Sequence, residues 1–237
     1  MVEVPLTGGH LTRDVTRIGE TVHRTKCPDF AVRVLSYLES AGYPYAPRHL
    51  GVDGQGRDML TFIPGQTTDH PSQRTVGAYT IGGKMLRALH DVTAGRDLAG
   101  DRECVIHGDP GPFNTIFQAG LPVAFIDWDF CRPGDRLTDL GYQAWTWCIQ
   151  ALGHVPVPEQ AGHLRELRDG YGDVEPEVLV RAILRRQTEV VETEQANVRD
   201  PTVSAERRRH AESAIAWATA DRRLVEQHER QLLAALE

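Results

Sequence analysis

Apolar and polar residues alternate near the start of the chain in a way that predicts a short hairpin. Residues 10–24 alternate loosely, and the stretch Ile18-Gly19-Glu20-Thr21 places glycine at the first position of a two-residue turn. A type II′ turn requires a positive φ at that position, which glycine adopts without strain. We therefore expect two antiparallel strands joined at Gly19.

A helix and a second hairpin are predicted next. The helix would bury four apolar residues at helical spacing, which are Phe30, Val34, Leu35 and Leu38. Asp29 is a suitable amino-terminal cap for this helix, and Gly42 a suitable stop. Turn-forming residues at 52–56 then precede an apolar run at 58–63, which predicts another pair of strands.

The pattern changes after Pro64-Gly65, because helical spacing dominates from there onward. Long helices are expected near 176–198 and 201–236, the second beginning with Asp200 as its cap and Pro201 in its first turn. Its apolar stripe consists of Ala211, Ile215, Ala218, Val225 and Leu232. We expect a domain boundary near residue 65 and an α+β chain with a small antiparallel sheet followed by a mainly helical part.

Within the second part lies a stiff polar loop, HGDPGPFNTIF, at residues 107–117. Short apolar runs at 104–106 and 115–117 flank it and are typical of strand ends. A third apolar run at 123–126 ends in Asp127, so a second acidic residue follows another strand. This order of strands and loops can bring Asp109, Asn114 and Asp127 together.

Composition narrows the classes of protein that remain. The 237 residues are 41% hydrophobic, which is enough for a substantial core. No apolar stretch reaches 18 residues and the amino terminus does not resemble a secretion signal, so we expect a cytoplasmic protein without a membrane partner. The net charge of −7 argues against a nucleic-acid partner. The four cysteines lack the spacing of a zinc site and are expected to be free thiols.

Two carboxylates and one amide near the polar loop suit a particular chemistry. Carboxylate and amide oxygens are hard ligands, and Mg²⁺ commonly combines a few of them with water and with substrate phosphates. A metal-bridged nucleotide is therefore the natural ligand. In phosphoryl transfer one aspartate accepts the proton of the acceptor hydroxyl, while an asparagine and another aspartate hold the metal.

These residues resemble a known family, the aminoglycoside phosphotransferases and related small-molecule kinases. His107-Gly108-Asp109 with Asn114 resembles their catalytic loop, and Ile126-Asp127-Trp128-Asp129 resembles their metal-binding segment. Further similarities lie at Phe62-Ile63-Pro64-Gly65, at Leu86-Arg87-Ala88-Leu89-His90, and at Pro133-Gly134-Asp135 with Asp139-Leu140. The resemblance implies a two-lobed, protein-kinase-like fold, with a nucleotide-binding lobe at 1–64 and a catalytic and substrate-binding lobe at 65–237.

The resemblance also implies roles for individual residues. Asp109 would be the catalytic base, and Asn114 and Asp127 the ligands of Mg²⁺. Thr61 and Ile63 would offer backbone groups to the base of ATP or GTP. His107 and Asp139 would support the catalytic loop, and Asp129 is expected to cap or form a salt bridge and not to bind the metal.

The chain departs from the family pattern in the part that would hold the nucleotide phosphates. Such kinases generally carry a lysine on the third strand, paired with a glutamate on the next helix, whereas the best-placed residue here is Arg24, with Lys26 second. Arginine can bind phosphate through two nitrogens but does not simply replace lysine. The helix has only Glu39, near its end, and Leu6-Thr7-Gly8-Gly9 offers only a glycine pair as a phosphate loop.

The leading hypothesis is a Mg²⁺-dependent kinase that phosphorylates a hydroxyl of a small molecule, first of all an aminoglycoside or another cationic antibiotic. Acidic residues of the late helices, Glu189, Glu192 and Glu194, would be suited to a polycation. A metabolite such as an amino alcohol is an alternative acceptor. A pseudokinase that binds nucleotide or ligand as a regulator is a second class, and a metal phosphohydrolase is the least favoured. The sequence leaves the oligomeric state open.

Overall fold

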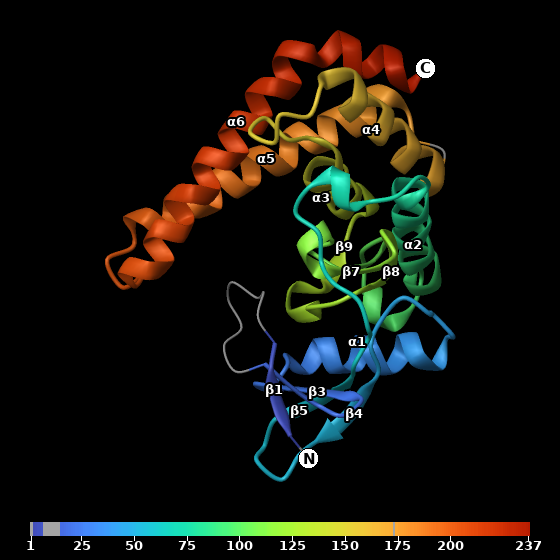
Figure 1. Ribbon diagram of the computed structural model, residues 1–237, viewed down its shortest axis with the longest axis vertical. Coiled ribbons are helices and arrows are strands. Elements are labelled where there is room, and N and C mark those ends of the chain that lie inside the picture. Colours follow the sequence, from blue (N-terminus) through green and yellow to red (C-terminus); the bar gives the residue numbers. More distant parts are fainter. Residues whose placement is uncertain (1, 7–14, 173) are drawn as a thin grey trace. The chain divides into compact units, whose positions relative to one another are not determined.

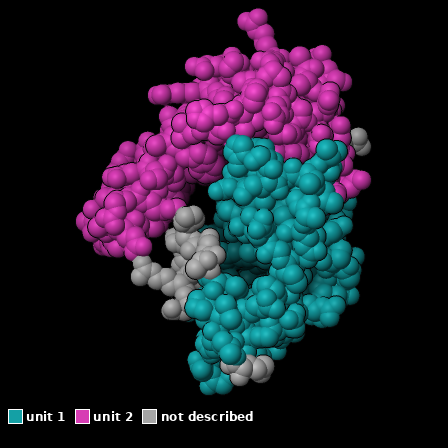
Figure 2. Space-filling view, viewed as in Figure 1, with its two compact units in different colours: residues 1–78, 85–136 teal, residues 79–84, 137–237 magenta. Residues whose placement is uncertain are grey.

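The computed structural model describes residues 2–6, 15–172 and 174–237 (Figure 1). The chain forms two compact units, shown in Figure 2. The first unit contains residues 1–78 and 85–136, and the second contains residues 79–84 and 137–237. The observed class is α+β, with antiparallel strands in the amino-terminal region and mainly helices in the carboxy-terminal part, as the sequence predicted.

A five-stranded antiparallel sheet of order β1-β2-β3-β5-β4 lies in the first unit. Its strands are β1 (Glu3–Pro5), β2 (Thr16–Ile18), β3 (Thr21–Arg24), β4 (His49–Val52) and β5 (Asp58–Thr61). Ile18 pairs with Thr21 across the two-residue turn, and Gly19 has a φ of 62°. The predicted hairpin at Gly19 is therefore confirmed, as is the hairpin that joins β4 to β5.

Helix α1 (Asp29–Ser40) runs beside this sheet in the same unit (Figure 1). Its buried residues are Ala31, Val34, Leu35 and Leu38. Full burial of a leucine or valine contributes about 1.5–3 kcal/mol, so this face anchors the helix. The predicted cap was wrong by one position, because Pro28 is the amino-terminal cap and Asp29 is the first helical residue.

The rest of the first unit contains two small antiparallel strand pairs and the greater part of α2 (Ala78–Thr93). β6 (Cys104–Ile106) pairs with β9 (Arg132–Gly134), and β7 (Thr115–Gln118) pairs with β8 (Leu121–Phe125). Four short 3-10 helices join these elements: η1 (Pro71–Gln73), η2 (Asp97–Ala99), η3 (Pro112–Asn114) and η4 (Trp128–Phe130). Gln66 and Phe117 exchange two backbone hydrogen bonds, which ties the segment after residue 65 to β7.

The compact units are therefore not divided at residue 65. Residues 65–78 and 85–136 cluster with the amino-terminal sheet. The compact units are defined by which parts of the chain pack together, whereas the two lobes were defined by their expected roles. The nucleotide-binding lobe at 1–64 and the catalytic lobe at 65–237 therefore stay a prediction.

The second unit is helical, with most of α3 (Arg136–Cys148) followed by α4 (Val157–Tyr171), α5 (Pro176–Arg199) and α6 (Ala205–Leu236). Every residue of α3 from Asp139 to Cys148 is buried. Helices α5 and α6 lie side by side along their lengths (Figure 1). Among the described residues, no helix combines the length and the apolar character that a membrane span requires.

The predicted start of α6 was wrong. Ser204 is the cap, and its hydroxyl oxygen accepts a hydrogen bond from the backbone N–H of Arg207. Asp200 instead follows the end of α5, where its carboxylate accepts from the backbone N–H of Thr202. The predicted stripe of α6 does face the core: Ala211, Ala218, Val225 and Leu232 are fully buried, while Ile215 is half-buried.

Candidate functional site

The polar loop predicted from the sequence connects β6 to β7 in the first unit. His107 begins it and is completely buried. Its Nε2 lies 3.1 Å from the carbonyl oxygen of Ile126, and its Nδ1 accepts a 3.3 Å hydrogen bond from the backbone N–H of Asp109. A carbonyl can only accept and an N–H can only donate, so these partners fit a neutral ring with its proton on Nε2. His107 thereby joins this loop to the segment that precedes Asp127.

Asp109 and Asn114 lie in direct contact within the loop. The side-chain amide nitrogen of Asn114 donates to the carbonyl oxygen of Asp109 at 3.1 Å and to its carboxylate Oδ2 at 2.9 Å. Both side chains are half-buried. Within the described residues, the Oδ1 of Asn114 accepts no hydrogen bond, so this hard oxygen is available to a cation.

Asp127 is brought to the same place through the backbone of its neighbour. The N–H of Ile126 donates to the carbonyl oxygen of Asn114 at 2.8 Å, and the carbonyl oxygen of Ile126 faces His107. Both peptide groups of Ile126 are thus held by the two ends of the polar loop. Asp127 follows with φ 60° and ψ 65°, a left-handed conformation that aspartate tolerates better than most residues.

Arg24, at the end of β3, reaches this acidic segment. Its Nη1 donates to Oδ1 of Asp127 at 3.1 Å, and its Nη2 donates to Oδ2 of Asp129 at 2.5 Å. Burial disfavours the charged guanidinium, but the charges of Asp129 and Asp127 outweigh that effect and raise the pKa of Arg24 above its usual value. The cation therefore stays charged between two carboxylates.

Asp129 had been expected only to cap or to form a salt bridge, and it forms one with Arg24. Burial raises the pKa of Asp129, and Arg24 opposes that shift. Lys26, the second choice for a phosphate-binding cation, has an exposed side chain that pairs with Asp29 at 3.2 Å. Glu39 pairs with Arg48 at 3.5 Å. No pattern in the sequence indicated that Asp129 would be a partner of Arg24.

The two positions expected to meet the nucleotide base differ in their backbone. The N–H of Thr61 donates to the carbonyl oxygen of Arg48 at 3.0 Å, and its hydroxyl accepts from the N–H of Arg48 at 2.9 Å. Within the described residues, Ile63 makes no backbone–backbone hydrogen bond. Ile63 is therefore better placed than Thr61 to offer an N–H group to a ligand.

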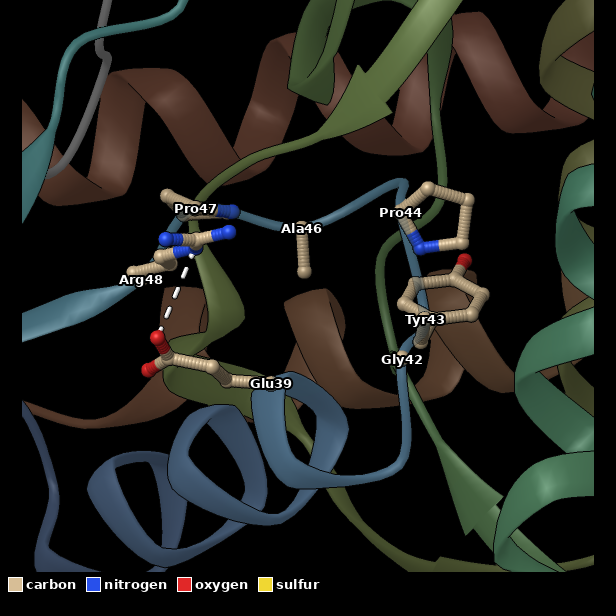
Figure 3. A pocket seen from close by; sticks show the side chains of 7 residues that line it. All are labelled: Glu39, Gly42, Tyr43, Pro44, Ala46, Pro47 and Arg48. Carbon is tan, nitrogen blue, oxygen red and sulfur yellow. Dashed lines mark ion pairs between the residues drawn. The ribbon is translucent and has the colours of Figure 1, made fainter.

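A cavity of about 300 Å³ lies near Thr61, at the end of α1 and the segment that leads to β4 (Figure 3). It is lined by Glu39, Gly42, Tyr43, Pro44, Ala46, Pro47 and Arg48. The ion pair between Glu39 and Arg48 lies on its wall (Figure 3). None of the residues predicted for catalysis, metal binding or nucleotide binding lines this cavity, although Arg48 on its wall is hydrogen-bonded to Thr61.

Two further groups of predicted residues lie in the second unit. Asp139 is buried in the first turn of α3, and its role in supporting the catalytic loop stays a prediction. On α5, Glu189 pairs with Arg185 and Arg186, and Glu194 pairs with Arg207 of α6. These arginines already neutralise two of the three carboxylates that were expected to bind a polycation. The late helices are therefore less suited to a polycation than the sequence suggested.

The donor set near the loop suits magnesium better than zinc. Within the parts of the chain that the structure describes, no three His, Cys, Asp or Glu side chains gather as a metal site, and the four cysteines are buried free thiols. Asn114 and Asp127 offer only oxygen. Such a pair leaves the remaining positions to water and phosphate oxygens, which Mg²⁺ commonly accepts.

Two comparisons with known sequences match a large part of this chain. The model of the phosphotransferase enzyme family matches residues 95–176. The trifolitoxin immunity protein of Rhizobium leguminosarum bv. trifolii is 34% identical over 195 residues, which cover 72% of this chain and 74% of that protein.

Two solved structures share the fold at low sequence identity. A choline/ethanolamine kinase family protein from Mesorhizobium loti has a TM-score of 0.61 and 20% identity, covering 94% of this chain and 88% of the other. ADP-bound aminoglycoside phosphotransferase APH(2'')-Ib has a TM-score of 0.62 and 14% identity, covering 92% of each chain. The protein-kinase-like fold implied by the sequence is confirmed. The chain belongs to the phosphotransferase enzyme family of aminoglycoside phosphotransferase-like kinases, which transfer phosphate to an alcohol group.

Proposed function

We propose that this protein is a Mg²⁺-dependent kinase that transfers the γ-phosphate of ATP or GTP to a hydroxyl of an antibiotic or toxin. One observation carries the proposal. The backbone of Ile126 is hydrogen-bonded to Asn114 and to His107, and this supports a site in which Asp127, the next residue, acts with Asp109 and Asn114. Asp109 would be the proton acceptor, and Asn114 and Asp127 would be the two oxygen ligands of a cation; all three belong to the first unit.

Each of the three residues has a distinct task in this proposal. The carboxylate of Asp109 orients the acceptor hydroxyl and takes its proton as the hydroxyl oxygen attacks the γ-phosphorus. The bond between the γ-phosphorus and the bridging oxygen then breaks, and the nucleoside diphosphate leaves. Oδ1 of Asn114 and the carboxylate of Asp127 would hold Mg²⁺, which supplies positive charge to the β- and γ-phosphates.

The nucleotide would be held by residues of the sheet and of the segment that follows it. Arg24 brings a buried positive charge beside Asp127, where the phosphates of a metal-bound nucleotide would lie. Ile63 would offer its backbone groups to the base, with Thr61 contributing its carbonyl oxygen. The ADP-bound state of the aminoglycoside phosphotransferase supports a nucleotide as the co-substrate.

The class of acceptor is inferred from the relatives. The immunity protein points to defence against a toxic compound, and the aminoglycoside phosphotransferase to an antibiotic. An aminoglycoside remains the first compound to test, although the arginine pairing of Glu189 and Glu194 removes part of the charge that would attract a polycation. The choline/ethanolamine kinase family protein makes an amino alcohol the alternative.

A transfer screen tests the proposal. The purified protein is incubated with ATP or GTP, with and without Mg²⁺, and with aminoglycosides, macrolides, trifolitoxin, choline and ethanolamine. We expect one group of acceptors to gain a phosphoryl group, detected by mass spectrometry, only when Mg²⁺ is present. Transfer that is equally fast in the presence of excess chelator would contradict the metal assignment.

A second function, a pseudokinase that binds nucleotide without turnover, is favoured by one contact. Arg24 donates to Asp127, so the cation and the proposed metal ligand neutralise each other in this structure. Nucleotide binding by calorimetry, with no product from any acceptor in the screen, would support the regulator and reject the kinase.

A further inference from the structure

We propose that Asp129 is a positioning residue that holds Arg24 toward the nucleotide phosphates while Asp127 binds the metal. This inference rests on the proposed kinase function and extends it to a residue whose sequence context suggested only a structural role.

The geometry of the arginine carries the first step. The two terminal nitrogens of Arg24 contact different carboxylates, Nη1 that of Asp127 and Nη2 that of Asp129. Arg24 is only 7% exposed. A buried guanidinium that loses its partner is costly, so at least one of these carboxylates has to stay on it throughout the catalytic cycle.

The single negative charge of Asp127 cannot fully neutralise Arg24 and bind Mg²⁺ at the same time. With Mg²⁺ held by Asp127, the carboxylate would share its negative charge with the metal, and Nη1 of Arg24 would then be available to a phosphate oxygen. Nη2 would stay on Asp129. The second carboxylate therefore keeps the guanidinium in place and oriented during the exchange.

The acidic residues of α1 are engaged elsewhere. Asp29 pairs with Lys26, and Glu39 pairs with Arg48 at the opposite end of the helix. In kinases the phosphate-binding cation must be paired with a carboxylate to be active. Here that carboxylate would come from the metal-binding segment itself, two residues after Asp127.

The backbone around Asp129 is suited to this task because it is tightly held. Asp129 lies in η4, directly after Trp128, which is 2% exposed and donates its indole N–H to the carbonyl oxygen of Phe125 at 3.1 Å. The N–H of Cys131 closes the turn on the carbonyl oxygen of Trp128 at 3.0 Å. A carboxylate on such a turn fixes the direction of its partner better than one on a long, exposed side chain.

The test compares Asp129→Asn with Asp53→Asn. Both substitutions keep the side-chain shape and remove a carboxylate from an arginine of the first unit, since Asp53 pairs with Arg57 at 2.8 Å. We expect Asp129→Asn to raise the KM for nucleotide roughly tenfold to a hundredfold, with a much smaller change in kcat. ADP binding measured by calorimetry without acceptor should weaken by a similar factor. Asp53→Asn should lower thermal stability and leave the KM unchanged.

A double variant separates positioning from folding. Lysine is one atom shorter than arginine and glutamate is one carbon longer than aspartate, so Arg24→Lys with Asp129→Glu should recover part of the nucleotide affinity that Arg24→Lys alone loses. If wild-type protein transfers phosphate but Asp129→Asn keeps a normal KM and ADP affinity, the positioning role is wrong. If wild-type protein neither binds Mg²⁺-nucleotide nor transfers phosphate, the proposed function itself fails.

Discussion

The side-chain amide of Asn114 donates to both the carbonyl oxygen and the carboxylate of Asp109, at 3.1 and 2.9 Å. An amide has its nitrogen and its oxygen on opposite sides of one planar group. With the nitrogen committed to Asp109, the oxygen points away from that residue. A single side chain thus orients the proposed base and presents the proposed metal ligand, and only four residues lie between the two.

Replacement of Asp109 tests the base. Asp109→Ala should lower turnover by roughly 10²- to 10⁴-fold, because the acceptor hydroxyl loses its proton acceptor while the nucleotide keeps its contacts. Steady-state kinetics and ADP calorimetry measure the two effects separately. Asp97→Ala, a change at the start of η2, is a suitable control. Unchanged turnover in Asp109→Ala would remove this residue from the mechanism.

Replacement of Asp127 tests the metal ligand. Asp127→Ala should weaken the binding of Mg²⁺-nucleotide and reduce the difference in affinity measured with and without Mg²⁺. Alanine also disfavours the left-handed backbone of this residue, whereas asparagine tolerates it. Asp127→Asn therefore reports the loss of charge with less strain. If both variants bind Mg²⁺-ATP as the wild type does, the ligand assignment is refuted.

A substitution at Gly108 tests how tightly the polar loop packs against Phe130 and Arg132. Gly108 has a φ of 87°, and an added Cβ would lie 2.4 Å from the carbonyl oxygen of Phe130 and 2.7 Å from Nη1 of Arg132. Gly56→Ala is a matched control, since Gly56 has a φ of 79° with no atom within 4 Å of the added Cβ.

We expect the control to lose about 1–2 kcal/mol of unfolding free energy from backbone strain alone. Gly108→Ala should lose distinctly more and should also lose activity, because Asp109 follows directly. Chemical denaturation and initial rates provide the comparison. If the two variants lose the same unfolding free energy, the loop can move to accommodate the added Cβ and is not tightly packed.

Asp221 should make stability depend on pH. Burial raises the pKa of this carboxyl to about 6, although the N–H of Ala151 and the indole N–H of Trp145 both donate to it. The folded state therefore binds a proton more tightly than the unfolded chain. Below about pH 4 the carboxyl group is neutral in both the folded and the unfolded state. As the pH rises from about 4 to about 6, the unfolded chain loses this proton before the folded protein does, so the free energy of unfolding falls.

The resulting loss is on the order of 2–3 kcal/mol by pH 7. The side chain of Asp221→Asn cannot ionise, so the variant should not lose stability in this way. Its unfolding free energy relative to that of the wild type should therefore increase as the pH rises. Urea denaturation at several pH values measures that difference. A constant difference from pH 4 to pH 7 would show that Asp221 does not titrate in this way.

Local sequence was enough to predict the elements whose signal lies within a few residues. Gly19 fixed the first hairpin through its positive φ, and the short apolar runs around residues 104–126 predicted the strands that hold the polar loop. The prediction of a helix start at Asp200 was wrong, although an aspartate followed by proline is typical of such a start. In the structure, α5 ends at this position, and a short turn leads to the cap of α6 at Ser204.

The contact between Arg24 and Asp129 was beyond sequence reasoning. The two residues are 105 positions apart, and both a cap and a surface pair were equally compatible with Asp129. Only the folded chain brings η4 within reach of the Arg24 side chain at the end of β3. The catalytic, metal-binding and nucleotide-binding roles of the predicted residues stay predictions.

The left-handed backbone at Asp127 also limits which natural substitutions could remove this carboxylate without disturbing the fold. Asparagine, glycine and histidine are each one nucleotide change away from aspartate and accept a φ of 60° more readily than most residues. Valine is also one change away, but its branched side chain disfavours this backbone. Natural variants that lack the carboxylate and still fold are therefore expected to carry one of the first three residues at position 127.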